Sequence, residues 1–101
     1  MTEFAGRALV PSHVLVRHLE GEAVLLNLET EKYFGLDATG TRMWELLTTL
    51  PSIDAAYKQL LNEFEVDPEL LRTHLAELLG RLAEYGLLSV SPSDVGTTPA
   101  I

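Results

Sequence analysis

The fold of this chain is decided by residues 22–36, which read Glu-Ala-Val-Leu-Leu-Asn-Leu-Glu-Thr-Glu-Lys-Tyr-Phe-Gly-Leu. Two apolar runs, 22–28 and 32–36, flank a short polar turn, which is typical of two antiparallel strands. Residues 13–19 are also rich in branched apolar side chains and are separated from 22–28 by a glutamate and a glycine. The sequence therefore predicts a three-stranded antiparallel meander.

After the third strand, the spacing of apolar residues changes to that of helices. Asp37, Ser52 and Asp67 each precede such a pattern and are residue types that cap helix N-termini. The predicted helices span residues 38 to about 50, 53 to about 64 and 68 to about 85. Gly86 stands where a left-handed C-cap glycine belongs. The order predicts an α+β fold, with the meander packed on a three-helix cluster.

The length of 101 residues suits one small domain and is too short for a core plus a deep catalytic cleft. Residues 1–11 have no period and are expected to be a flexible lead-in. Residues 12–90 are expected to fold, and residues 91–101, rich in serine, proline and glycine, to form a disordered tail. The expected core consists of Val24, Leu26, Leu28, Phe34, Leu36, Trp44, Leu47, Leu60, Phe64, Leu75, Leu78 and Leu82.

The charge balance argues against several classes of partner. A formal net charge of -8 opposes binding to nucleic acids and to anionic membrane surfaces. The absence of cysteine excludes disulfides, cysteine-ligated metals and thiol catalysis. No apolar run has the length of a membrane span, and the N-terminus does not resemble a signal peptide. The cytoplasm is the expected location.

The sequence predicts no enzyme, cofactor or metal site. His13 and His18 are five apart and His74 is isolated, so none has the spacing of metal ligands. The carboxylates Asp67 and Glu69 are explained by helix capping and the helix dipole. Phosphate-binding loops and nucleotide fingerprints are absent.

The kind of function that these exclusions leave is the binding of a ligand at an exposed sheet edge. The outer edge of strand 32–36 has no partner in a meander, and Gly35 lets another backbone approach it. Helix 68–85 is apolar over a wider face than one sheet contact requires. A groove between this strand and this helix would explain the excess, and so would a dimer contact.

Several motifs resemble those of PqqD-like proteins, the precursor-peptide recognition elements of ribosomally made, post-translationally modified peptides. They are the strand and turn Gly21–Thr30, the third strand Tyr33–Leu36, Gly40 with Trp44–Leu47, and the closing run Leu82–Leu88. Together they extend over about residues 13–90 in the order of the family.

The resemblance implies a winged-helix-like β3α3 domain without catalytic activity. Such a domain binds the leader region of a precursor peptide as an added strand on its third strand, in a groove with its third helix, and delivers it to a processing enzyme. The implied peptide-binding residues are Glu31, Lys32, Tyr33, Phe34, Gly35, Leu36, Leu70, His74, Leu75, Leu78 and Arg81. Lys32, Arg72 and Arg81 are expected to contact leader carboxylates.

The strand and turn over 23–30 resemble the lasso-peptide group most, in which a separate transglutaminase-like cysteine peptidase removes the leader. Three alternatives stay open: a PqqD-type peptide chaperone of pyrroloquinoline quinone biosynthesis, an acidic winged-helix interaction or dimerisation subunit, and a nucleic-acid-binding winged helix. The last is disfavoured, because the polar positions of helix 68–85 carry three carboxylates and two arginines.

Overall fold

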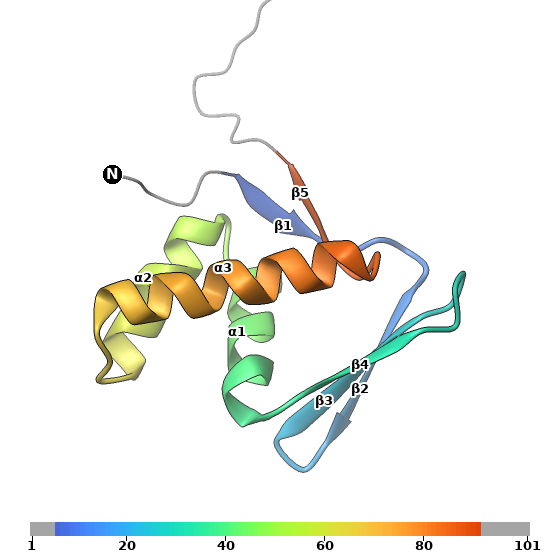
Figure 1. The fold of residues 1–101 in the computed structure, drawn as a ribbon, viewed down its shortest axis with the longest axis horizontal. Coiled ribbons are helices and arrows are strands. Elements are labelled where there is room, and N and C mark those ends of the chain that lie inside the picture. The colour runs from blue at the N-terminus through green and yellow to red at the C-terminus, as the bar shows by residue number, and fades with distance from the viewer. Residues whose placement is uncertain (1–5, 92–101) are drawn as a thin grey trace, which may run out of the picture.

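Three strands followed by three helices, in the predicted order, form the body of the chain (Figure 1). The computed structural model describes residues 6–91. Its elements are β1 (Arg7–Leu9), β2 (Val14–Leu19), β3 (Glu22–Asn27), β4 (Tyr33–Leu36), α1 (Ala38–Thr49), α2 (Ile53–Glu63), α3 (Pro68–Glu84) and β5 (Ser89–Ser91). The predicted α+β architecture is confirmed.

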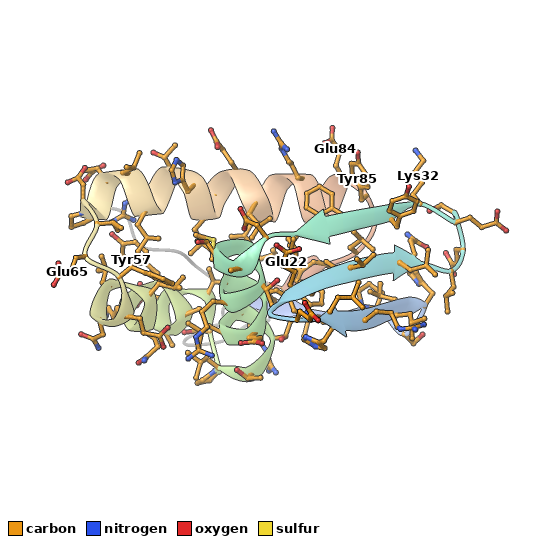
Figure 2. The ribbon with its side chains drawn as sticks, turned by 90° about the horizontal axis from the view of Figure 1, so that it is seen from below. Glu22, Lys32, Tyr57, Glu65, Glu84 and Tyr85 are labelled. Carbon is orange, nitrogen blue, oxygen red and sulfur yellow. The ribbon has the colours of Figure 1, made fainter. Side chains whose placement is uncertain are left out.

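The main sheet is antiparallel with the strand order β2-β3-β4. β4 lies along α3, and β3 and β2 follow at increasing distance from that helix (Figure 2). The register pairs Leu26 with Tyr33 and Val24 with Gly35 across β3 and β4. β4 is therefore an edge strand of this sheet.

The helix boundaries follow the predicted capping residues. The side-chain oxygens of Asp37, Ser52 and Asp67 accept hydrogen bonds of 2.8, 3.0 and 3.3 Å from the main-chain N–H groups of Gly40, Ala55 and Leu70. At the end of α3, the N–H of Leu87 donates to the carbonyl of Leu82 at 2.9 Å, and Gly86 has a φ of +70°. This is the predicted left-handed C-cap, and it turns Leu87 into the core.

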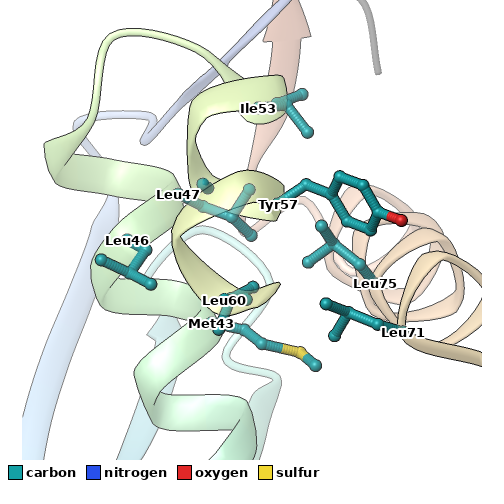
Figure 3. Packing of buried hydrophobic residues seen from close by; sticks show 9 residues of the cluster. Met43, Leu46, Leu47, Ile53, Tyr57, Leu60, Leu71 and Leu75 are labelled. Carbon is teal, nitrogen blue, oxygen red and sulfur yellow. The ribbon is translucent and has the colours of Figure 1, made fainter. Parts of the chain in front are cut away.

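Two clusters of buried side chains make up the core. The first joins the three helices, and Figure 3 shows the ring of Tyr57 on α2 directed towards α3, where Leu71 and Leu75 lie. The second lies between the sheet, α1 and the end of α3, and includes Trp44 and Leu82. Six of the twelve predicted core residues are buried: Leu36, Trp44, Leu47, Leu60, Leu75 and Leu82.

The predicted inward face of β3 is wrong. Ala23, Leu25 and Asn27 are buried, whereas Val24 and Leu26 are half-buried and Leu28 is 55% exposed. Because residues 23–26 are all apolar, alternation alone does not reveal which face is buried. The polar side chain of Asn27 favoured the opposite face of β3 as the buried one, and this prediction is wrong.

Asn27 can be buried because both its amide nitrogen and its Oδ1 have hydrogen-bond partners. Its amide nitrogen donates to the carbonyl of Tyr85 at 3.0 Å, and its Oδ1 accepts from the N–H groups of Glu29 and Thr30 at 2.9 and 3.2 Å. A buried amide with these partners avoids the cost of losing water. Three further predicted core residues, Phe34, Phe64 and Leu78, are only half-buried at the margins of the clusters.

A second, two-stranded sheet was not predicted. β1 pairs antiparallel with β5, in a register that places Arg7 opposite Ser91. The expected lead-in therefore contains a strand, and Ser91 of the expected tail belongs to another. Residues 1–5 and 92–101 of those two segments lie outside the described residues.

Candidate functional site

The outer edge of β4 offers main-chain groups for pairing. Within residues 6–91, no strand pairs with this edge. The N–H of Asn27 donates to the carbonyl of Lys32 at 2.8 Å, which fixes the phase of the ladder between β3 and β4. Because antiparallel pairing alternates, Phe34 and Leu36 direct their main-chain groups towards β3, whereas Tyr33 and Gly35 direct theirs outwards.

The open edge is shorter than predicted. Glu31 lies in the turn with a φ of +65°, and its N–H donates to the carbonyl of Asn27 at 2.7 Å. The N–H of Lys32 donates to Oγ1 of Thr30 at 3.3 Å. These two N–H groups are therefore used inside the turn and are not offered at the open edge, where the side chains of Glu31 and Lys32 are exposed.

A groove of about 250 Å³ lies between β4 and α3. It is lined by Phe34, His74, Glu77, Leu78 and Arg81. Four of these residues are predicted site residues, and the structure brings them together from two elements that are distant in sequence. Glu77 was not among the predicted site residues, although its helical spacing from His74 and Arg81 places it on the same flank of α3.

A second hollow of about 180 Å³ adjoins the groove, because His74 lines both. It lies between α1, the α2–α3 connection and the start of α3. Its lining consists of Thr39, Met43, Phe64, Val66, Leu70, Leu71 and His74. Of the predicted site residues, Leu70 and His74 are found here, and the other five were not predicted, since they come from three separate segments.

Two predicted site residues do not reach the surface. The side chains of Leu36 and Leu75 are 5% and 0% exposed and belong to the two core clusters. Their side chains therefore have no free surface for a ligand. Leu70, in contrast, is 49% exposed.

The end of α3 packs against β4 through Phe34, one of the residues that line the groove. The ring of Tyr85 meets the ring of Phe34 edge to face, with centroids 5.3 Å apart and an angle of 72° between the planes. Figure 2 shows Tyr85 beside the start of β4, close to Lys32. Since Asn27 binds the carbonyl of Tyr85, the end of α3 is fixed to both β3 and β4.

The cations near the site differ in their surroundings. Within the described part of the chain, neither Lys32 nor Arg81 makes an ion pair. Both are available for a carboxylate ligand. The guanidinium of Arg72 instead lies 4.9 Å above the ring of Tyr57, which places it on the α2 side of α3.

The described residues contain no cluster of three or more histidine, aspartate or glutamate side chains that could hold a metal ion. Among residues 6–91, no helix is long and apolar enough to cross a membrane. The features that remain are a main-chain edge, a groove lined by apolar and polar side chains including Arg81, an adjoining hollow lined mainly by apolar side chains, and Lys32 in the turn before β4. This arrangement suits the binding of an extended peptide.

Comparison with known proteins places the chain in a family. The model of the family described as coenzyme PQQ synthesis protein D (PqqD) matches residues 22–88. Among solved structures, TbiB1 in complex with the TbiA(beta) leader peptide is similar, with 32% identity and a TM-score of 0.73 over 89% of this chain and 98% of that chain.

A lasso peptide synthetase B1 complexed with the leader peptide has the same fold, with a TM-score of 0.73 and 22% identity over 82% of this chain and 98% of that chain. No curated protein matches the chain. The family match begins at the start of β3 and runs through all three helices to the buried residues after α3. The chain therefore belongs to the PqqD family, in agreement with the resemblance of its sequence motifs.

Proposed function

We propose that this chain binds the leader region of a ribosomally made precursor peptide by adding it as a fourth strand at the outer edge of β4. One observation carries the proposal: the open edge at Tyr33 and Gly35 borders a groove between β4 and α3, which is lined by both apolar and polar side chains. The likeness to TbiB1, whose structure includes a leader peptide, supports the same ligand class.

The edge defines a register for the peptide. We propose antiparallel pairing, since the sheet is antiparallel and such pairs are slightly more stable per residue. Three successive peptide residues then lie opposite Gly35, Phe34 and Tyr33. The middle one shares the face of Phe34 and points into the groove, towards Leu78 and His74.

Main-chain pairing alone gives weak binding. Each hydrogen bond contributes about 0.5–1.5 kcal/mol net. Ordering a flexible peptide costs about 2–5 kcal/mol or more. Apolar peptide side chains in the groove and in the adjoining hollow must therefore supply the remaining affinity. In this proposal, Lys32 and Arg81 bind carboxylates of the leader.

In this proposal the chain is a non-catalytic carrier. Having bound the leader, it presents the peptide to a processing enzyme, for which we propose the lasso-peptide leader peptidase, a transglutaminase-like cysteine peptidase. Because ribosomal peptides are made in the cytoplasm, we propose that the chain acts there. The family name supports a second candidate, a peptide chaperone of pyrroloquinoline quinone biosynthesis, which would bind a different precursor at the same edge.

Amide hydrogen exchange tests the proposed edge. In the free chain, the amides of Tyr33 and Gly35 should exchange rapidly and those of Phe34 and Leu36 slowly, because only the latter bond to β3. The probes are the TbiA(beta) leader and the leaders of short precursors encoded near the gene of this chain. A bound leader should slow exchange at Tyr33 and Gly35, leaving Phe34 and Leu36 as internal controls.

A second measurement tests strand addition from the peptide side. Single N-methylation along a bound leader should abolish binding at alternate positions only, because every second peptide N–H faces β4. The proposal fails if none of these leaders binds, or if a leader binds while Tyr33 and Gly35 continue to exchange rapidly.

A further inference from the structure

The face of the main sheet that points away from the core is apolar next to the open edge. Tyr33, Gly35, Val24 and Leu26 share this face, because the register pairs Tyr33 with Leu26 and Gly35 with Val24. Tyr33 is 71% exposed, and the side chains of Val24 and Leu26 are half-buried. This outer face lies opposite the groove, which is on the side of Phe34.

Gly35 interrupts the outer face, and the fold itself does not require a glycine there. Its φ is not in the left-handed region, and a Cβ added to it would meet no atom within 4 Å. Glycine inside a strand lowers stability and leaves no side chain to pack. The free space above Gly35 is therefore not explained by any contact within residues 6–91.

The register defines the neighbours of this open space, which we call the notch. Its floor is the main chain of Gly35, one wall is Val24 across the strand pair, and the other is Tyr33 on the same strand. On a pleated sheet, a side chain directly opposite a residue lies about 4.5–5.5 Å from it, and aromatic side chains also reach diagonal neighbours. A large side chain on an added strand would thus cover Gly35 and contact Tyr33.

We propose that this notch is a specificity site for a bulky apolar side chain of the leader, at the peptide position opposite Gly35. The inference rests on the proposed strand addition and extends it to the second face of the peptide. The residue opposite Gly35 fills the notch, and the next residue, opposite Phe34, fills the groove. Two adjacent leader residues are therefore read on opposite faces of β4.

The test replaces Gly35 and measures stability and binding together, using the TbiA(beta) leader and its single-alanine series. Gly35→Val should raise Tm by about 2–6 °C, because valine suits strands and the added atoms meet open space. The same variant should weaken binding of the unaltered leader about tenfold or more, because the notch is filled. Gly35→Ala should change both quantities in the same directions by smaller amounts.

The alanine series locates the contact. The leader truncated to alanine opposite Gly35 should bind the wild-type chain and Gly35→Val within about twofold of each other. The matched control is Gly80→Ala on the exposed side of α3, where an added Cβ also meets no atom within 4 Å. That variant should raise Tm and leave leader affinity unchanged.

Two outcomes would contradict the notch as a specificity site without contradicting strand addition. Either Gly35→Val binds the unaltered leader as the wild-type chain does, or its loss of affinity is equal for every peptide in the alanine series. If the wild-type chain does not bind the TbiA(beta) leader, the same series is made from whichever of the other leaders named above it does bind. Failure to bind any of these leaders is seen before any variant is compared, and it contradicts the proposed function together with the notch.

Discussion

At the scale of single residues, Asn27 connects the parts that form the groove. Its side chain holds the β3–β4 turn through Oδ1 and the end of α3 through its amide. Gly86 lies directly against it, because a Cβ on Gly86 would come within 2.7 Å of the amide nitrogen. The contact between the end of α3 and the β3–β4 turn thus depends on the Asn27 amide and on the absence of a Cβ at Gly86.

A pair of glycine substitutions separates this contact from backbone strain. Gly86 and Gly21 both have positive φ, +70° and +86°, but only Gly86 is crowded. Gly21→Ala should lower the free energy of unfolding by about 1–2 kcal/mol through the left-handed backbone alone. Gly86→Ala should cost about 1–3 kcal/mol more, because it displaces the Asn27 amide from the Tyr85 carbonyl. Urea unfolding measures both, and equal losses would contradict the role of Asn27.

At the scale of elements, α1 and α2 are joined on the surface by an ion pair. The guanidinium of Arg42 donates to both carboxylate oxygens of Glu63, at 2.8 and 2.6 Å, and Gln59 donates to one of them at 2.9 Å. These hydrogen bonds, that of Arg42 above all, lower the pKa of Glu63 to about 2. The carboxylate is therefore more acidic in the folded chain than in the unfolded one.

This shift predicts a pH dependence of stability. Because the folded pKa is the lower one, the contribution of Glu63 is complete above its ordinary pKa of 4.5 and is lost as the pH falls towards 2. The Tm difference between the wild-type chain and Glu63→Gln should be constant near neutral pH and shrink across that range. Melting curves from pH 7 to 2 measure it, with Glu65→Gln as the control, since Glu65 makes no ion pair within residues 6–91. A Tm difference that does not change with pH would show that the pair contributes nothing.

At the scale of the whole molecule, β1 and β5 join the two ends of the described chain, away from β4. Ala8 on β1 is half-buried and packs against both core clusters. The N–H of Ile53, at the start of α2, donates to the carbonyl of Gly6 at 3.0 Å. This small sheet supports the domain without contributing to the groove.

Substitutions on β1 should therefore change stability and leave binding unaltered. Ala8→Asp should lower the free energy of unfolding by about 1–3 kcal/mol or more, because it places a charge against the core. Leu9→Asp, on the exposed side of the same strand, should have a much smaller effect. Leader affinity, measured where all chains are folded, should be equal for the three proteins. A loss of affinity in Ala8→Asp would mean that the small sheet is coupled to the groove.

The sequence by itself determined the features that depend on near neighbours. The caps at Asp37, Ser52 and Asp67, the C-cap at Gly86 and the order of strands and helices all follow from short patterns, because their hydrogen bonds join residues a few positions apart. The edge position of β4 follows from the order of the meander, and the family from its motifs. The resemblance of these motifs to the family also implied four residues that line the groove, Phe34, His74, Leu78 and Arg81.

Tertiary structure alone decided the features that depend on distant segments. Both faces of β3 are apolar, so the buried face was chosen by contact with α1 and the end of α3, where Asn27 finds its partners. The pairing of Arg7 with Ser91 joins opposite ends of the described chain, beyond the reach of any local pattern. The burial of Leu75 and the adjoining hollow likewise required the helices to be packed, because burial belongs to an arrangement of elements and not to any one of them.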